Sequence, residues 1–178
     1  LLGQHGRERL DDEVREPPPA EPLSAENGAA VTANDIYRLY FHGPAYQVLD
    51  RAWHADGVVV GRFAEDLPAD HLATSGSTLI APRLIELCFQ TAGLWQAGRE
   101  DQLALPMRVG SARVVGDPST AATPLQAHAR QIADGVFECV VVDADGDAVV
   151  QLDGYRTIAL PVPLAADISA DLHATYRD

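Results

Sequence analysis

The sequence predicts an α+β domain in which an antiparallel sheet wraps around one long buried helix. Three observations lead to this class: a single apolar helical segment over residues 78–97, strand-like runs on both sides of it, and tight turns between the runs. With 178 residues, of which 47% are hydrophobic and 22% charged, the chain has the length and composition of one globular domain.

Two predicted strands precede the helix and form a hairpin. Residues 46–53 and 57–63 are rich in Val and aromatic side chains, which favour strands. Asp56 and Gly57 lie at the junction of the two runs, and an Asp-Gly step is typical of a two-residue hairpin turn. We therefore expect the two strands to pair directly.

The central segment, residues 78–97, is predicted to be a helix that is buried on almost every side. Within 84–95 the only polar side chains are those of Glu86, Gln90 and Thr91. A helix that is apolar nearly all round packs inside a core and not on a surface. This segment is therefore the element around which the sheet is expected to curl.

Gly98 is expected to end this helix, and four strands are predicted to follow it. The Ala133-Asp-Gly135 and Asp145-Gly-Asp147 steps are good hairpin turns, so that neighbouring strands are expected to be antiparallel. The predicted strands are residues 105–115, 125–133, 136–143 and 148–158.

The two ends of the chain differ from this central part. Residues 1–34 are predicted to be a linker or tail, because the first half of this segment is dense in charge and residues 16–24 are rich in proline. The domain is expected to occupy residues 35–162, and residues 163–178 are predicted to be a second tail, a linker or a short docking helix. A chain that begins with a linker resembles a piece of a longer protein.

Composition excludes several classes of function. The net charge of −13 argues against nucleic acid or an anionic membrane as a partner. All 13 basic residues are arginine, which excludes Schiff-base chemistry through lysine and, with the abundant alanine, suggests a bacterial source. Cys88 and Cys139 form no metal or disulfide pattern and are expected to be small core residues. No signal peptide or apolar run of about 18 residues is present, so a cytoplasmic protein is predicted.

Glu86 is the candidate catalytic residue of the apolar helix. A carboxylate in such surroundings is costly unless it is paired, neutral or used in chemistry. Glu86 and Gln90 are four residues apart, so they share a helix face and can form a hydrogen bond. Gly93 would let another backbone approach closely. The pattern predicts a general acid at Glu86, and the alternative is a structural carboxylate whose head reaches water.

The helix also resembles a known family. The spacing of Pro82, Glu86 and Gln90 is similar to the catalytic helix in the second hotdog of polyketide synthase dehydratase domains. That family usually has Asp at the acid position, whereas this chain has Glu. The Glu86, Gln90 and Gly93 spacing also resembles the helix of the small β-hydroxyacyl-carrier-protein dehydratases of fatty-acid synthesis, which use Glu.

Two further motifs occur in the order expected for that family. Residues 41–47, Phe-His-Gly-Pro-Ala-Tyr-Gln, resemble the Gly-Pro motif at the start of the second dehydratase hotdog. Residues 104–107, Ala-Leu-Pro-Met, resemble the Leu-Pro strand that follows the helix and lines the substrate tunnel. The resemblance covers about residues 36–160, implies a hotdog fold, and looks closest to iterative synthases of the enediyne and polyunsaturated type.

The resemblance implies a lyase that removes water from a β-hydroxyacyl thioester on the phosphopantetheine of an acyl carrier protein. No metal and no cofactor of the domain's own is implied. Glu86 would protonate the leaving hydroxyl, and Gln90 would orient Glu86 or hold water. The residues expected to line the substrate site are His42, Gly43, Pro44, Tyr46, Leu105 and Pro106.

The catalytic histidine of these dehydratases is missing from its usual motif. That motif, His-x-x-x-Gly-x-x-x-x-Pro, belongs to the first hotdog and is not found in this chain. One explanation is that the chain is the C-terminal half of a double hotdog and works with an N-terminal half. Another is that His71, 15 residues before Glu86, acts across a homodimer, as the base does in small dehydratases. His71 is otherwise a surface-loop residue.

Two other functions fit the same pattern. A hotdog thioesterase would also place a carboxylate near the central helix and would hydrolyse the acyl thioester. An isolated half-domain could instead be a structural element without activity. An isolated half-domain would also expose an apolar edge where its partner hotdog belongs, and such a surface is expected to self-associate, so a homodimer is predicted in isolation.

Overall fold

The computed structural model describes residues 21–24, 30–68, 80–164, 170 and 172. Its eight strands form one antiparallel sheet in the order β1-β2-β3-β6-β7-β8-β4, and β5 also pairs with β8. The strands are β1 (Val31–Thr32), β2 (Leu49–Ala55), β3 (Val58–Phe63), β4 (Gln102–Arg108), β5 (Ser111–Val114), β6 (Gln126–Ala133), β7 (Val136–Val142) and β8 (Ala148–Pro163). The helical segments are α1 (Ala33–Leu39), the 3₁₀ turn η2 (Pro44–Tyr46) and α2 (Ile80–Glu100).

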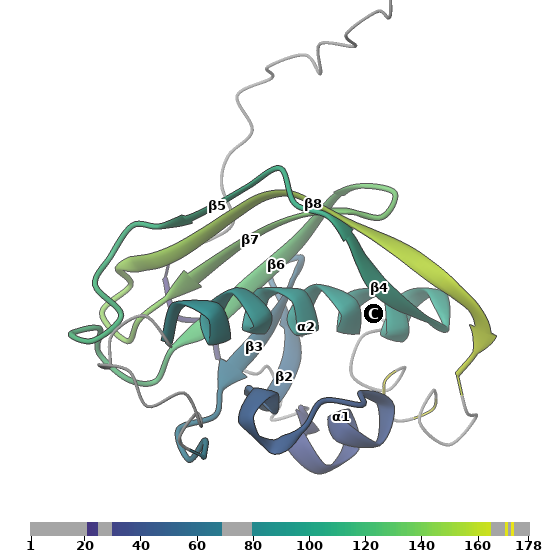
Figure 1. Ribbon diagram of the computed structural model, residues 1–178, viewed down its shortest axis with the longest axis horizontal. Helices are drawn as coiled ribbons and strands as arrows, with labels where there is room; N and C mark the ends of the chain where they lie inside the picture. The colour runs from purple at the N-terminus through teal and green to yellow at the C-terminus, as the bar shows by residue number, and fades with distance from the viewer. Residues whose placement is uncertain (1–20, 25–29, 69–79, 165–169, 171, 173–178) are drawn as a thin grey trace, which may run out of the picture.

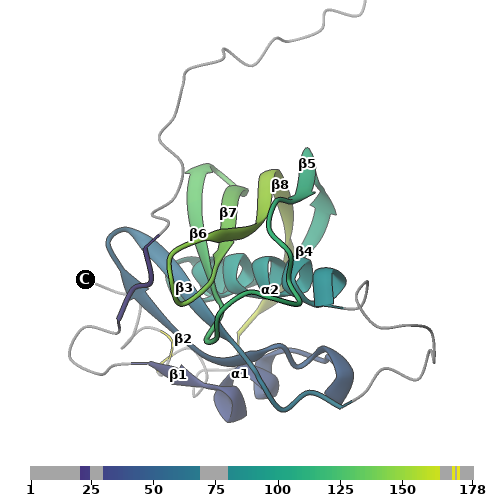
Figure 2. The same cartoon turned by 90° about the vertical axis from the view of Figure 1, so that its left-hand side faces the viewer.

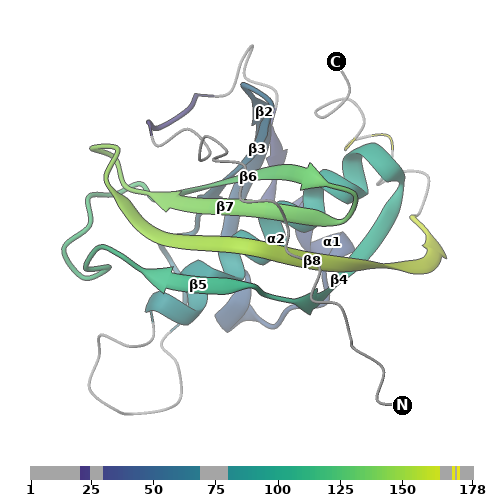
Figure 3. The ribbon, with the colours of Figure 1, turned by 90° about the horizontal axis from the view of Figure 1, so that it is seen from above.

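The sheet curls around α2, as the sequence predicted (Figures 1 and 2). Seen from above, β6, β7 and β8 lie across α2 (Figure 3). Helix α1 lies on the side of α2 away from β7 and β8 (Figure 1). The α+β class is therefore confirmed, with the long apolar helix at the centre of the curved sheet.

The core forms where α2 meets the concave face of the sheet. Leu84, Leu87, Ala92 and Leu94 of α2 are fully buried, and apolar residues of β3, β6 and β7 complete the same cluster. Each fully buried leucine stabilises the fold by roughly 1.5–3 kcal/mol relative to an exposed one. This burial explains why α2 forms despite carrying few surface polar groups.

Both cysteines lie in this core, as predicted. Cys88 and Cys139 are buried and unbridged, and the Cys139 Sγ lies 3.9 Å from the Cys88 carbonyl oxygen. A hydrogen bond with Cys88, together with burial, raises the pKa of the Cys139 thiol, so it stays protonated at neutral pH. Among the described residues, no group of three or more His, Cys, Asp or Glu side chains could hold a metal ion.

The predicted hairpin turns are confirmed by the backbone. Asp56 and Gly57 have φ values of 48° and 74°, and Ala55 pairs with Val58 across this two-residue turn. Gly135 and Gly146, in the two later turns, also have positive φ. The Asp-Gly and Gly-Asp steps therefore set the register of the strands on either side of them.

Several predicted boundaries were wrong. The first predicted strand does not begin at Tyr46, which ends the η2 turn; β2 runs from Leu49 to Ala55. Helix α2 continues through Gly98 to Glu100, and Asp101 (φ 55°) takes the left-handed position that follows it. Residues 105–115 are not one strand but parts of β4 and β5, because the chain turns at Gly110, where a side chain would meet the Asp153 carbonyl oxygen at 2.7 Å. Strand β8 runs to Pro163 and not to residue 158.

The described residues near the two ends of the chain contact the domain. The Leu23 N–H donates to Gln126 Oε1 at 2.9 Å, and Gln126 Nε2 donates to the Leu23 carbonyl at 3.2 Å. Leu172 is buried and belongs to the main core cluster. Strand β1 begins at Val31, four residues before the predicted start of the domain. No helix in the described part of the chain is long and apolar enough to cross a membrane.

Candidate active site

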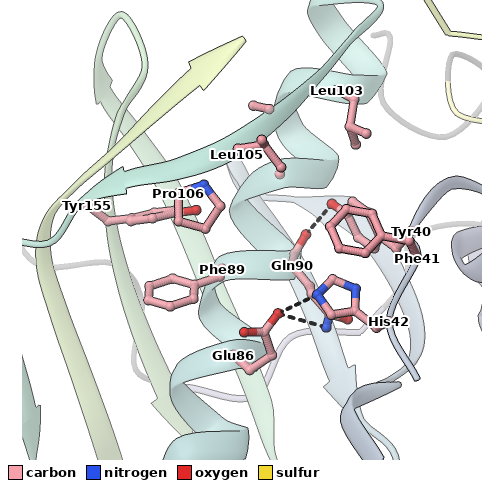
Figure 4. A pocket seen from close by; sticks show the side chains of 12 residues that line it. Tyr40, Phe41, His42, Glu86, Phe89, Gln90, Leu103, Leu105, Pro106 and Tyr155 are labelled. Atoms are coloured by element: carbon pink, nitrogen blue, oxygen red, sulfur yellow. Dashed lines mark hydrogen bonds and ion pairs between the residues drawn. The ribbon is translucent and has the colours of Figure 1, made fainter. Parts of the chain in front are cut away.

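A cavity of about 250 Å³ opens between α2, β4 and the segment that follows α1 (Figure 4). Most of its wall is apolar, and the polar side chains that reach it come from three separate parts of the chain. Such a cavity, with a few converging polar groups, is the usual form of a small-molecule site. Its lining residues are Tyr40, Phe41, His42, Glu86, Phe89, Gln90, Gly93, Leu103, Ala104, Leu105, Pro106 and Tyr155.

Glu86 projects from α2 into this cavity, and one of its carboxyl oxygens contacts two donor groups. Its Oε1 lies 3.0 Å from His42 Nε2 and 3.0 Å from Gln90 Nε2 (Figure 4). The side chains of His42 and Glu86 are 24% and 20% exposed, respectively, so both are mostly screened from water but reachable from the cavity. The hydrogen bond predicted between Glu86 and Gln90 from their spacing is present.

Gln90 is buried and has all of its polar atoms engaged. Its Nε2 also donates to the Tyr46 carbonyl at 2.9 Å, and its Oε1 accepts from the Tyr37 hydroxyl at 2.9 Å. Its backbone carbonyl accepts from the Tyr40 hydroxyl at 2.8 Å. Gln90 therefore connects α1, the η2 segment and α2 beneath the carboxylate.

Two tyrosine hydroxyls near the carboxylate are kept protonated. Burial raises the pKa of Tyr37 and of Tyr155 well above the ordinary range for tyrosine, and the nearby charge of Glu86 acts in the same direction. The Leu49 N–H donates to the Tyr37 hydroxyl oxygen at 2.7 Å and would lower the pKa of Tyr37. Burial and the Glu86 charge outweigh this effect. Both groups therefore remain hydrogen-bond donors at neutral pH.

The aromatic side chains set the shape of the cavity. Phe89 stacks on Tyr155 with ring centroids 4.7 Å apart, and this pair forms one end of the wall (Figure 4). Phe41 stacks on the His42 ring at 5.4 Å and is 79% exposed, so it lies at the opening. Phe41 and the Phe89–Tyr155 pair therefore both contribute aromatic surface to the cavity wall.

The structure brings five of the predicted site residues to the cavity: His42, Glu86, Gln90, Leu105 and Pro106. Gly43, Pro44 and Tyr46 are not among its lining residues. Pro44 begins η2, and Tyr46 contributes its carbonyl, the acceptor for Gln90. His71 lies outside the described residues, so its role stays a prediction.

The close approach predicted at Gly93 is made by a side chain and not by a backbone. A Cβ at Gly93 would lie 2.5 Å from the Tyr40 hydroxyl oxygen. Sequence reasoning missed Tyr37 and Tyr40 altogether, as well as the Phe89–Tyr155 pair. The available signal was the spacing of Tyr37 and Tyr40, three residues apart and shortly before the Gly-Pro motif, which is typical of one helix face.

The cavity wall ends at the edge of the described sheet. Among the described strands, β4 supplies four of the lining residues, is the last in the order and pairs with β8 alone. Met107 on β4 is 57% exposed and Ile158 on β8 is 54% exposed. An edge strand with exposed apolar side chains is a ready surface for pairing with another chain or domain.

Comparisons with known proteins bear on the family and the fold of this chain. The family model described as "Polyketide synthase dehydratase N-terminal domain" matches residues 15–166. A search of curated proteins finds no match. Among solved structures, the dehydratase domain of the polyketide PpsC from Mycobacterium tuberculosis is 25% identical, with a TM-score of 0.59. The match covers 80% of this chain and 55% of that one.

Two other dehydratase structures show the same fold. The dehydratase domain from the CurF module of curacin polyketide synthase is 21% identical with a TM-score of 0.58, covering 75% of this chain and 49% of that one. A trans-AT polyketide synthase dehydratase domain from Brevibacillus brevis is 17% identical with a TM-score of 0.57, with the same coverage of 75% and 49%. The hotdog fold is therefore confirmed, and the chain spans about half the length of the dehydratases it matches.

Proposed function

Because the chain belongs to the polyketide synthase dehydratase family, we propose that it supplies the acid for removing water from a β-hydroxyacyl thioester. The observation that supports this proposal best is the geometry of Glu86. A carboxyl group with one oxygen fixed by two donors faces a mostly apolar cavity large enough for a short acyl segment. A positioned acid in a site that is largely screened from water transfers its proton to a bound substrate more effectively than one in bulk water.

The proposed reaction balances without a cofactor. A base removes the proton from the α-carbon, and the electron pair of that C–H bond forms the double bond to the β-carbon. The bond between the β-carbon and the hydroxyl oxygen breaks, and this oxygen takes the proton of Glu86 and leaves as water. The substrate class we propose is an acyl chain on the phosphopantetheine of an acyl carrier protein.

His42 is the histidine beside Glu86, but its geometry does not suit the role of the base that removes the α-proton. Its Nε2 is engaged by Glu86 at 3.0 Å, and its buried Nδ1 has no hydrogen-bond partner among the described residues. We therefore propose that the base comes from outside the described site. The two sources are a histidine of another hotdog half and His71 of a second copy of this chain.

The β4 edge of the described sheet supports a partner at the open side of the cavity. The family model that matches residues 15–166 is described as an N-terminal domain, but the helix bearing Glu86 and the Gly-Pro segment resemble the second hotdog, so we propose that the chain is the C-terminal half of a double hotdog. In isolation the same edge is expected to pair with a second copy and form a homodimer. We further propose a cytoplasmic bacterial synthase of the iterative enediyne or polyunsaturated type, with a role in antibiotic biosynthesis.

The reverse reaction tests the proposed function. The chain is incubated with a trans-2-enoyl pantetheine thioester, and both hydration of the double bond and release of free thiol are measured. Hydration without thiol release is the expected result. Thiol release without hydration would contradict it and indicate a thioesterase. No reaction from the folded chain, either alone or with the upstream half added, would indicate a structural element.

A further inference from the structure

We propose that Tyr37 is a positioning residue that fixes which oxygen of Glu86 meets the substrate. Tyr37 does not line the cavity, and it acts through the amide of Gln90. Together with His42, this amide occupies Oε1 of Glu86 and leaves Oε2 as the oxygen that exchanges a proton. The role in catalysis rests on the proposed dehydratase function, whereas the arrangement of hydrogen bonds can be tested without it.

The burial of one His42 ring nitrogen indicates which nitrogen of the ring carries the proton. In the part of the chain that the structure describes, the Nδ1 atom has no hydrogen-bond partner, and an N–H buried without an acceptor is costly. The imidazole is therefore expected to carry its proton on Nε2, where Glu86 Oε1 accepts it at 3.0 Å. His42 then donates to the carboxylate through Nε2.

The Gln90 side depends on the direction of one amide group. Tyr37 accepts a hydrogen bond from the Leu49 N–H, so the proton of its own hydroxyl is directed to Gln90 Oε1. The amide nitrogen of Gln90 then faces two acceptors, the Tyr46 carbonyl and Glu86 Oε1. Reversing the amide would place its oxygen against both acceptors and its nitrogen against the Tyr37 proton, so a single orientation is strongly favoured.

The consequence concerns the two lone pairs of Glu86 Oε1. Both are occupied by donors, one from His42 and one from Gln90. The other oxygen, Oε2, is drawn on the opposite side of the carboxylate from both donors (Figure 4). A proton on Oε2 is compatible with both hydrogen bonds, and its loss to the substrate leaves a carboxylate that is already stabilised.

The Gln90 side chain gives a readout that does not depend on activity. Its amide signals in ¹⁵N NMR are assigned by their loss in Gln90→Leu. We expect well-separated, slowly exchanging amide protons in the native chain, and faster exchange with shifted signals in Tyr37→Phe. Thr91→Val is the matched control, because it removes another buried hydroxyl hydrogen bond of α2, to the Leu87 carbonyl. Unchanged Gln90 signals in Tyr37→Phe would overturn the proposal.

The catalytic consequence is tested by a double-mutant cycle on enoyl thioester hydration. Tyr37→Phe is expected to lower kcat roughly tenfold to 10²-fold with little change in KM, because a misplaced carboxylate weakens only the reacting geometry. Added to Gln90→Leu, Tyr37→Phe should cause no further loss of kcat. Independent, multiplicative losses would overturn the proposed route through Gln90. If the native chain does not hydrate the substrate, either alone or with the upstream half added, the dehydratase proposal fails while the NMR result still decides the position of Gln90.

Discussion

Substitution of Gly93 tests whether Tyr40 is held as the structure shows. Alanine at an exposed helix position is favoured over glycine by about 1 kcal/mol, so a simple helix argument predicts that Gly93→Ala stabilises the protein. The structure predicts the reverse. The new Cβ would lie 2.5 Å from the Tyr40 hydroxyl oxygen, and the next nearest atom of that ring is 3.5 Å away.

The expected loss of stability in Gly93→Ala follows from the groups that must move to make room for the new Cβ. Overpacking a buried contact costs about 1–3 kcal/mol, and the hydrogen bond from the Tyr40 hydroxyl to the Gln90 carbonyl contributes about 1 kcal/mol. Subtracting the gain of about 1 kcal/mol for alanine leaves a net loss of about 2 kcal/mol in the free energy of unfolding. Because Tyr40 lines the cavity, the variant should also lose hydration activity.

Urea unfolding of four proteins measures this directly: the native chain, Gly93→Ala, Tyr40→Phe and the double variant. Without the Tyr40 hydroxyl the new Cβ meets only ordinary contacts, so Gly93→Ala should stabilise the Tyr40→Phe background by up to about 1 kcal/mol. A stabilising effect in the native background, or the same loss in both backgrounds, would refute the assigned contact.

Two further predictions concern stability. The buried Gln126 side chain forms hydrogen bonds with both the N–H and the carbonyl of Leu23. Gln126→Leu should therefore lower the free energy of unfolding by about 1–3 kcal/mol and speed hydrogen exchange of the Leu23 amide. An unchanged exchange rate would contradict this prediction. Burial alone would raise the pKa of Asp143, but hydrogen bonds from the backbone N–H groups of Asp147 and Ala122 outweigh it and hold the pKa below its usual range. This carboxylate therefore stabilises the fold above the unfolded-state pKa, and the stabilisation is lost as the pH falls through the lower folded value. Asp143→Asn should make thermal stability less sensitive to acid than in the native chain, and an identical pH profile would argue against the effect.

Local patterns in the sequence predicted the elements that depend on neighbouring residues. The apolar run of α2 and the Asp56-Gly57 turn need only the 3.6-residue period and the positive φ that Gly allows, and both were found. The hydrogen bond between Glu86 and Gln90 follows from one turn of helix. Such features could be predicted because their partners lie close together in the sequence.

The remaining features depend on contacts between distant segments. Tyr37 meets Gln90 across 53 positions in the chain, and no local pattern joins them. The turn between β4 and β5 is imposed by the close approach of Asp153 to Gly110. His42 was expected only to line the site, and its hydrogen bond to Glu86 became visible only in three dimensions.

The central claim is that Glu86 exchanges a proton with the substrate. The most direct measurement is the rate of enoyl thioester hydration by the native chain, Glu86→Gln and Glu100→Gln. Glu100 is an exposed carboxylate on the same helix and outside the cavity, so its variant is a matched control. The account predicts a loss of roughly 10²–10⁴-fold in Glu86→Gln, with a rate close to native in Glu100→Gln. A folded Glu86→Gln variant that hydrates the substrate at the native rate would contradict it.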